Sequence, residues 1–368
     1  MKNLMKILLI NIAVVAVFFV IAEVGARAYF TLKTCLSGEC DEFLFTRFNL
    51  FNENKMIGLS TTDPLLGYKP NPGFSAIIHH PPGWDQVYVS IDQHGFRRHV
   101  DDNHVSEHSG ERLLAVGDSF TFGDQVKNSD TWPACIAQQT RLDVWNGGVF
   151  GYGAAQAVLR AEQTIANHGP FDIIIWSITV ASDFKRDQLR VRSNFPKPHI
   201  ASVEGETMMV PTGYFDPSPD FMWLLGYSVI LHEHLLPIIQ KEGDFFYDGR
   251  YKVRGERAAE IEDIIDFSMQ SFAGINGTKK KSILLQYDPW IFSERDLERI
   301  NEERKLIVKY GEKYNIVIID SFDQVYVPEK RDELWFGYKD FGHHTPYGNK
   351  AVCDVVLKWL DRDTSQIM

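Results

Sequence analysis

Residues 112–119 read RLLAVGDS, and this short apolar run ending in a glycine turn decides the fold. The next segment, residues 130–140, predicts a helix with a cap at Asp130 and with Pro133 in its first turn. A strand, a loop and a helix in this order form the building unit of a parallel α/β sheet. The serine that ends the run therefore lies where the first strand gives way to a helix.

The same alternation of strand and helix continues toward the C-terminus. Strands that are buried on both faces of a parallel sheet read as near-continuous apolar runs. Such runs predict strands at 142–145, 172–180, 282–286 and 316–320, and helical patterns predict helices at 154–168, 293–314 and from 347 onward. Five strands separated by helices predict a doubly wound parallel sheet.

Three regions precede or interrupt this alternation. Residues 1–30 predict a membrane anchor or signal segment, and residues 31–105 predict a stalk followed by a small β-rich lead-in. The α/β domain covers residues 106–368, with an insertion at about 188–278. The apolar stretch 221–227 within the insertion is too short to span a bilayer. We interpret it as core packing, with a lid or a membrane-facing patch as the alternative.

The N-terminus indicates the compartment. Lys2 and Lys6 come before an uncharged apolar run over residues 7–22, which is the arrangement of a targeting segment. The run approaches the ~30 Å needed to cross a hydrocarbon core if the side chain of Lys6 snorkels. We favour a retained anchor over a cleaved signal, and the lysines favour a cytoplasmic N-terminus. A single-pass inner-membrane protein with its domain in the periplasm or another extracytoplasmic space is expected.

Composition excludes several classes of protein. The chain has 44% apolar and 24% charged residues, 27 glycines and 16 prolines, which excludes disorder and collagen-like repeats. Lysine and arginine total 38 against 49 acidic residues, a net charge of −11, and no basic run is present. Nucleic-acid binding is therefore not expected.

Neither a metal nor a cofactor is expected. His232 and His234 are two residues apart, so on a helix they face different sides, and their spacing is not that of a His-Glu-x-x-His site. The glycine-rich residues 146–153 match neither a dinucleotide-binding fingerprint nor a P-loop. The four cysteines include no Cys-x-x-Cys pair of a zinc ribbon.

The cysteines form two candidate pairs. Cys35 and Cys40 lie just after the apolar segment, where an oxidising space allows a small disulfide loop; two unpaired thiols are the alternative. Cys135 and Cys353 lie on the first and last helices of the domain, and they approach each other if both helices cover the same face of the sheet. They are either a disulfide or two small buried hydrophobes.

Two segments hold the residue types that nucleophilic catalysis requires. A serine directly after a strand and its glycine turn, as at Ser119, can expose its hydroxyl where backbone N–H groups point at an oxyanion. Residues 340–348 read DFGHHTPYG, in which Asp340 and His343 can share a hydrogen bond that sets the imidazole tautomer. His344 is a rival for the role of His343. Taken separately, a surface turn is the favoured interpretation of the first segment, and a polar loop that caps the last helix is the favoured interpretation of the second.

Together and in this order, these blocks resemble those of the SGNH hydrolases, also called GDSL-type esterases, over residues 106–362. Gly117-Asp118-Ser119-Phe120 is similar to the first block of the family, and Asn146 with Gly151 is similar to the second. Asp340 with His343 is similar to the last block. The lead-in stretches 63–68 and 94–97 are similar to those of a bacterial, membrane-anchored branch of the superfamily.

The resemblance implies a three-layer αβα fold with a flavodoxin-like, five-stranded parallel sheet. It also implies Ser119 as nucleophile, His343 as general base and Asp340 as the orienting carboxylate. The backbone N–H groups of Ser119 and Gly151 would form the oxyanion hole. The family usually has asparagine where this chain has Ser182, and a serine hydroxyl can take over that donor role only in part.

The expected function is that of a serine esterase acting on an O-acyl ester of a glycan, with O-acetyl as the favoured acyl group. An O-acyltransferase using the same triad is one alternative, and a non-catalytic glycan-binding or assembly protein, suggested by Ser182, is another. Possible substrate-binding residues are Asp118, Asp183, Trp335 and His344. A sugar platform could be formed by the aromatic residues before His343 together with the charged residues after the third strand. Core packing explains the aromatic residues equally well, and a solvated charged face explains the charged ones. The aromatic residues are Trp335, Phe336, Tyr338 and Phe341, and the charged residues are Asp183, Lys185, Arg186 and Asp187.

Overall fold

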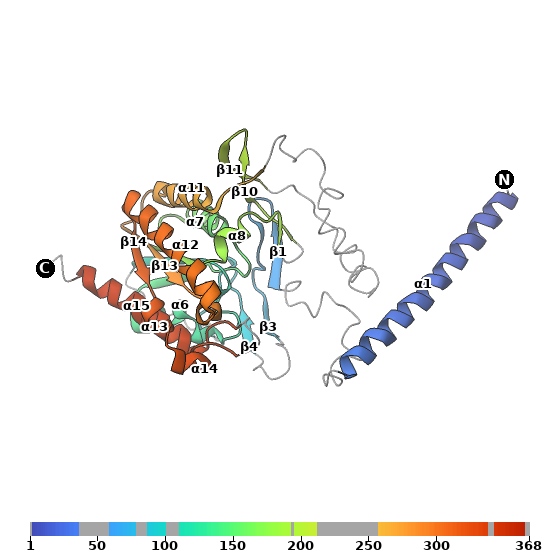
Figure 1. The fold of residues 1–368 in the computed structure, drawn as a ribbon, viewed down its shortest axis with the longest axis horizontal. Helices are drawn as coiled ribbons and strands as arrows, with labels where there is room; N and C mark the ends of the chain where they lie inside the picture. The colour runs from blue at the N-terminus through green and yellow to red at the C-terminus, as the bar shows by residue number, and fades with distance from the viewer. Residues whose placement is uncertain are drawn as a thin grey trace. The chain divides into compact units, whose positions relative to one another are not determined.

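The computed structural model describes residues 2–36, 59–78, 87–100, 110–192, 195–211, 257–337 and 342–364. The chain divides into two compact units. In the first, α1 (Lys2–Leu36) is a single long helix, drawn in blue in Figure 1. Residues Ile10–Tyr29 of α1 have a mean hydropathy of 2.0, so by length and composition this helix can serve as a membrane anchor or a signal segment.

The second unit is built on a five-stranded parallel sheet. Its strands are β5 (Arg112–Val116), β6 (Asp143–Asn146), β7 (Ile173–Thr179), β13 (Lys280–Gln286) and β14 (Val317–Asp320). They lie in the order β14-β13-β7-β5-β6, which is 5-4-3-1-2 in chain order, or 2-1-3-4-5 from the other edge. This is the flavodoxin-like order, so the predicted fold class is confirmed. All residues of the central strand β7 are buried, as the apolar run required.

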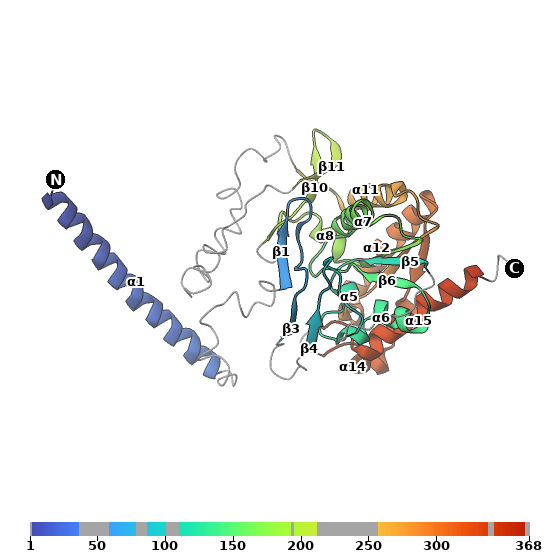
Figure 2. The same cartoon turned by 180° about the vertical axis from the view of Figure 1, so that it is seen from behind.

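Helices cover both faces of this sheet (Figures 1 and 2). α6 (Trp132–Gln139) and α15 (Pro346–Thr364) pack against each other on one face. On the other face α11 (Ile261–Gly274) packs between α7 (Ala154–His168) and α12 (Glu294–Lys313). The result is a three-layer αβα arrangement, with a core formed by the strands and the inner faces of these helices.

The remaining elements are short. They are β1 (Ser60–Asp63), β2 (Gly67–Pro70), β3 (Ser75–Ile78), β4 (Val87–Ser90), α5 (Ser119–Phe122), α8 (Asp183–Arg186), β8 (Val191–Arg192), β9 (Phe195–Pro196), β10 (His199–Val203), β11 (Glu206–Val210), β12 (Arg257–Ala258), α13 (Phe322–Val325) and α14 (Arg331–Leu334). Three short 3-10 helices span Asn128–Asp130, Pro289–Phe292 and Pro328–Lys330.

Two boundaries differ from the prediction. α6 starts at Trp132, because the side chain of Thr131, rather than that of Asp130, accepts the hydrogen bond of the Ala134 N–H at 3.2 Å. The expected insertion ends earlier than residue 278, because α11 is the crossover helix that joins β7 to β13. The residues that α11 buries recur at helical spacing, and all of them except Ser268 are apolar: Ile264, Ile265, Ser268, Met269 and Phe272.

The lead-in belongs to the same compact unit as the sheet. β1 pairs with β2 and β3 pairs with β4, both antiparallel. Arg97, just after the second hairpin, donates its backbone N–H to the carbonyl oxygen of Asn146 at 3.1 Å and so bridges to the edge strand β6. The described residues 59–78 and 87–100 therefore form a small β-rich lead-in that packs on the domain.

Cys135 and Cys353 form a disulfide that joins α6 to α15. The two helices lie on the same face of the sheet, which is the condition under which the sequence allowed the pair to meet. A second link is the hydrogen bond from the Trp132 N–H to Asn349 Oδ1 at 3.1 Å. Cys40 lies outside the described residues, as do residues 221–227, His232 and His234.

Candidate active site

Ser119 lies at the carboxyl end of β5, where the strand turns into α5. Asp118 caps this helix by accepting the N–H of Phe120 at 2.9 Å. Gly117 is needed for the turn, because a Cβ there would lie 2.9 Å from the carbonyl oxygen of Ser177 on β7. The serine is therefore held in a tight turn at the carboxyl edge of the sheet, which is where ligands bind in open α/β folds.

His343 and Ser119 meet across 224 residues of sequence. The distance between His343 Nε2 and Ser119 Oγ is 2.8 Å. His344, the rival histidine, is 1% exposed and packs between the rings of Phe120 and Trp335. Its burial lowers the pKa of His344 to about 3. His343 is thus the histidine placed to take a proton from the serine.

The Nδ1 side of the His343 ring contacts the loop that follows α5. Gln125 Oε1 accepts the backbone N–H of His343 at 2.9 Å and lies 3.1 Å from His343 Nδ1. Asp124 Oδ2 lies 3.9 Å from the same nitrogen. An acceptor beside Nδ1 favours the tautomer that leaves Nε2 free to accept a proton. The expected partner, Asp340, lies outside the described residues.

The lead-in fixes this loop. Arg97 is 2% exposed, and its guanidinium donates to the carbonyl oxygens of Phe122 at 2.8 Å, Val126 at 2.6 Å and Gly123. These carbonyls lie on either side of Gln125, whose backbone is left-handed with φ 72°. Sequence reasoning missed Gln125, and its only signal was its position six residues after Ser119.

The loop after β6 brings Gly151 to the same edge. Gly151 has φ +71°, a conformation that favours glycine. Asn146 shapes the start of this loop, because its Oδ1 accepts the Gly148 N–H at 3.1 Å. Among the residues that the structure describes, the N–H groups of Ser119 and Gly151 donate to no other group. Both remain available to a bound oxygen.

Arg186 joins the loops that follow the first three strands. Its Nη1 lies 2.7 Å from Asp118 Oδ2, 2.7 Å from Asp183 Oδ1 and 3.2 Å from the carbonyl oxygen of Tyr152. Asp183 Oδ2 also accepts the Thr179 N–H at 2.8 Å. Burial, and then the neighbouring charge of Asp118, raise the pKa of Asp183 well above its usual value. Asp118 and Asp183 are thus buried structural partners of Arg186 and not an open substrate surface.

The loop after β7 is fixed by two further carboxylates. Ser182 donates its hydroxyl to Asp288 Oδ2 at 3.2 Å, so its single hydrogen is directed away from the expected oxyanion role. Ala181 is left-handed with φ 65°, and its N–H donates to Glu303 Oε1 on α12 at 2.6 Å. Burial raises the pKa of Glu303 to about 7 and that of Asp288 to about 6.

The buried Glu303 predicts a pH dependence of stability that Glu303→Gln removes. Since burial raises the pKa of Glu303 from 4.5 to about 7, the folded state holds this proton more tightly than the unfolded state. Its stabilising contribution is complete below pH 4.5 and is lost as the pH rises toward 7. Relative to Glu303→Gln, the free energy of unfolding of the wild type should fall by about 2–3 kcal/mol over this window.

Urea denaturation of both proteins at a series of pH values measures this difference. Other titrating groups are common to the two proteins and cancel in the comparison. Parallel pH profiles would show that Glu303 ionises in the folded protein as it does in the unfolded chain.

Three of the residues suggested as a sugar platform are buried, namely Trp335, Asp183 and Asp187. Trp335 is 1% exposed and packs on Phe292 with ring centroids 5.4 Å apart. Asp187 is also 1% exposed, and it accepts the Ala155 N–H at 2.9 Å. Their side chains are used for packing, so they do not offer a surface to a ligand. Lys185 is exposed, and Tyr338 and Phe341 lie outside the described residues.

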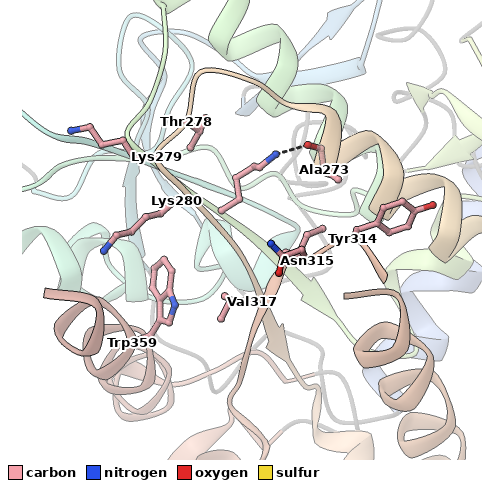
Figure 3. A pocket seen from close by; sticks show the side chains of 10 residues that line it. Ala273, Thr278, Lys279, Lys280, Tyr314, Asn315, Val317 and Trp359 are labelled. Atoms are coloured by element: carbon pink, nitrogen blue, oxygen red, sulfur yellow. Dashed lines mark hydrogen bonds between the residues drawn. The ribbon is translucent and has the colours of Figure 1, made fainter. Parts of the chain in front are cut away.

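A cavity of about 410 Å³ lies away from Ser119 (Figure 3). It is lined at the amino ends of β13 and β14 by residues that include Lys280, Val317 and Trp359. The neighbouring Lys281 donates to the carbonyl oxygens of Phe272, Ala273 and Ile275 and so caps α11. Within the described ranges, no group of three or more metal-ligating side chains is present.

Comparison with known proteins gives similarity in fold alone. No protein-family model and no curated protein matches the chain. A member of the lipolytic protein G-D-S-L family from Veillonella parvula is 13% identical over 68% of this chain and 97% of its own, with a TM-score of 0.39. An acetyl xylan esterase variant from Geobacillus stearothermophilus is 13% identical over 68% and 94%, with a TM-score of 0.39. The lipase/acylhydrolase from Enterococcus faecalis is 14% identical over 68% and 95%, with a TM-score of 0.38. Similarity at this level establishes neither membership of a family nor an activity.

Proposed function

We propose that this protein is a serine esterase that forms an acyl-enzyme at Ser119. The observation that supports the proposal most directly is the 2.8 Å contact between Ser119 Oγ and His343 Nε2. A serine hydroxyl is a weak nucleophile until a base within hydrogen-bond reach takes its proton. The packing that places Gln125 beside the other imidazole nitrogen supports His343 as that base, and Asp340 is proposed to complete the triad.

The reaction then proceeds in two halves. His343 Nε2 takes the hydroxyl proton as Ser119 Oγ attacks the ester carbonyl, and the backbone N–H groups of Ser119 and Gly151 bind the resulting oxyanion. The protonated His343 returns this proton to the leaving alkoxide, which leaves an acyl-enzyme. A water molecule gives its proton to His343 and attacks the acyl carbonyl; the bond to Ser119 Oγ then breaks, Ser119 takes the proton back from His343, and the acid is released. A sugar hydroxyl in place of water would give acyl transfer.

We further propose an acylated glycan outside the cytoplasmic membrane as the substrate class. Retention of α1 as an anchor would hold the domain at the membrane surface. The disulfide between Cys135 and Cys353 supports an oxidising compartment, where such bridges persist. The glycan part of the proposal rests on the resemblance of the sequence blocks to those of carbohydrate esterases.

Labelling with a fluorophosphonate tests the nucleophile. The wild type should be labelled at one site and should hydrolyse a p-nitrophenyl acetate, whereas Ser119→Ala should lose both properties, a loss of about 10⁴-fold or more in kcat. Ser129→Ala is the matched control, because Ser129 is exposed and its hydroxyl contacts only the neighbouring Asp130 at 3.0 Å among the interactions described. Normal labelling of Ser119→Ala would refute the assignment. Product formation with a sugar acceptor in excess would identify acyl transfer.

A further inference from the structure

The peptide group between Phe150 and Gly151 is held by a hydrogen bond at its carbonyl end. Tyr68, on β2 of the lead-in, donates its hydroxyl to the carbonyl oxygen of Phe150 at 2.8 Å. That carbonyl and the Gly151 N–H belong to the same rigid, planar peptide group. A hydrogen bond to the oxygen therefore sets the direction in which the N–H points.

The tyrosine lies close enough to constrain Gly151 itself. A Cβ on Gly151 would be 3.1 Å from the Tyr68 hydroxyl oxygen and 3.0 Å from Cγ of Arg192. The hydroxyl and the left-handed backbone together leave this peptide little freedom to rotate. We propose that Tyr68 is a positioning residue that aims and polarises the Gly151 N–H as an oxyanion donor. This inference rests on the proposed esterase function.

The hydroxyl is preorganised by the elements around it. Tyr68 is fully buried, and its ring packs edge-on against that of Tyr152 with centroids 5.2 Å apart. The Tyr152 hydroxyl donates to the Tyr68 carbonyl oxygen, and Gln156 Nε2 on α7 donates to the Leu66 carbonyl oxygen at 2.6 Å. Because these contacts hold the turn and the second strand of the short β-hairpin that carries Tyr68, the hydroxyl needs no rearrangement during the reaction.

Two physical effects follow from the contact. A hydrogen bond to a carbonyl oxygen draws electron density from the amide and strengthens its N–H as a donor. Burial also raises the pKa of the Tyr68 hydroxyl, so that it stays protonated and able to donate over the range of an enzyme assay. Loss of an entire oxyanion donor typically lowers the rate by about 10²–10³-fold, so a misdirected donor should cost about 10-fold.

The test compares Tyr68→Phe with the wild type, using the full chain in detergent. The second-order rate constant of fluorophosphonate labelling and kcat for p-nitrophenyl acetate should each fall about 10-fold, while KM changes little. Affinity for a trifluoromethyl ketone, whose adduct carries an oxyanion, should fall by the same factor. A loss of folded protein alone would lower the amount labelled, but it would leave unchanged the labelling rate constant, KM and the kcat calculated per labelled site.

Tyr287→Phe is the matched control for loss of a buried hydroxyl. Tyr287 is fully buried and donates to Asp320 Oδ1 at 2.9 Å, so this variant should lose stability but keep the labelling rate constant. If Tyr68→Phe does not fold, 3-fluorotyrosine at position 68 supplies the test, because its more acidic hydroxyl should raise the rate constant about two-fold. Wild-type rate constants in the foldable variant overturn the inference. A wild type that is not labelled at all overturns the esterase proposal instead.

Discussion

Replacing His343 by alanine should lower kcat for p-nitrophenyl acetate by about 10⁴-fold, with little change in KM. The imidazole takes part in both halves of the proposed reaction, since it accepts the serine proton and later activates water. Its Nε2 lies 2.8 Å from Ser119 Oγ. Without it, binding and the backbone donors supply the only remaining acceleration. The measurement is initial-rate kinetics together with the rate constant of fluorophosphonate labelling.

His344→Gln is the matched control for this variant. His344 is buried between Phe120 and Trp335, so its replacement should lower the thermal stability while the folded fraction keeps its kcat. A larger loss of kcat in His344→Gln than in His343→Ala would exchange the roles of the two histidines.

Arg186→Met should lower the free energy of unfolding by about 3–5 kcal/mol, the usual result when one partner of a buried ion pair is removed. The substitution leaves the carboxylates of Asp118 and Asp183, both 1% exposed, without the guanidinium that lies 2.7 Å from each. Desolvation of an unpaired charge is costly, so the loss comes mainly from the carboxylates that remain. Urea denaturation at neutral pH measures the change.

A second substitution tests this cause directly. Adding Asp183→Asn to Arg186→Met removes one of the two buried acids that must otherwise lose their partner or take up a proton, so the double variant should regain part of the lost stability. A double variant that is less stable than Arg186→Met would contradict the electrostatic explanation, as would a loss below about 1 kcal/mol in Arg186→Met itself, which is the size expected for an exposed pair.

The sheet could be predicted from the sequence because each of its strands has a local pattern of apolar residues. β7 is a nearly continuous run of apolar and β-branched residues, interrupted only by Ser177, because both of its faces are buried. The meeting of Ser119 with His343 could also be anticipated, since both residues follow blocks that belong at the carboxyl edge of such a sheet. Two residues far apart in sequence are brought together by topology: the alternation of strands and helices predicts the doubly wound sheet, and the resemblance to the SGNH hydrolases implies its strand order and this pair.

The residues that hold the site together could not be predicted in this way. Arg186 and Glu303 look like ordinary surface charges in the sequence, and their burial depends on partners from other loops. Apart from its position six residues after Ser119, nothing in the sequence points to Gln125, because its role depends on a left-handed backbone conformation that glutamine rarely adopts. The sequence suggested Ser182 as an oxyanion donor because it stands where the family usually has asparagine. The direction of its hydroxyl is set by Asp288, which is distant in sequence.

The bridge between α6 and α15 has a consequence for biogenesis. Its cysteines are 218 residues apart, so during synthesis the first thiol emerges long before its partner. Four cysteines can pair in three ways, and thiol exchange takes seconds to hours. A reducing cytosol would keep the thiols reduced and unpaired. Mispaired chains would lack the covalent link to α15, the helix that begins directly after the loop carrying His343.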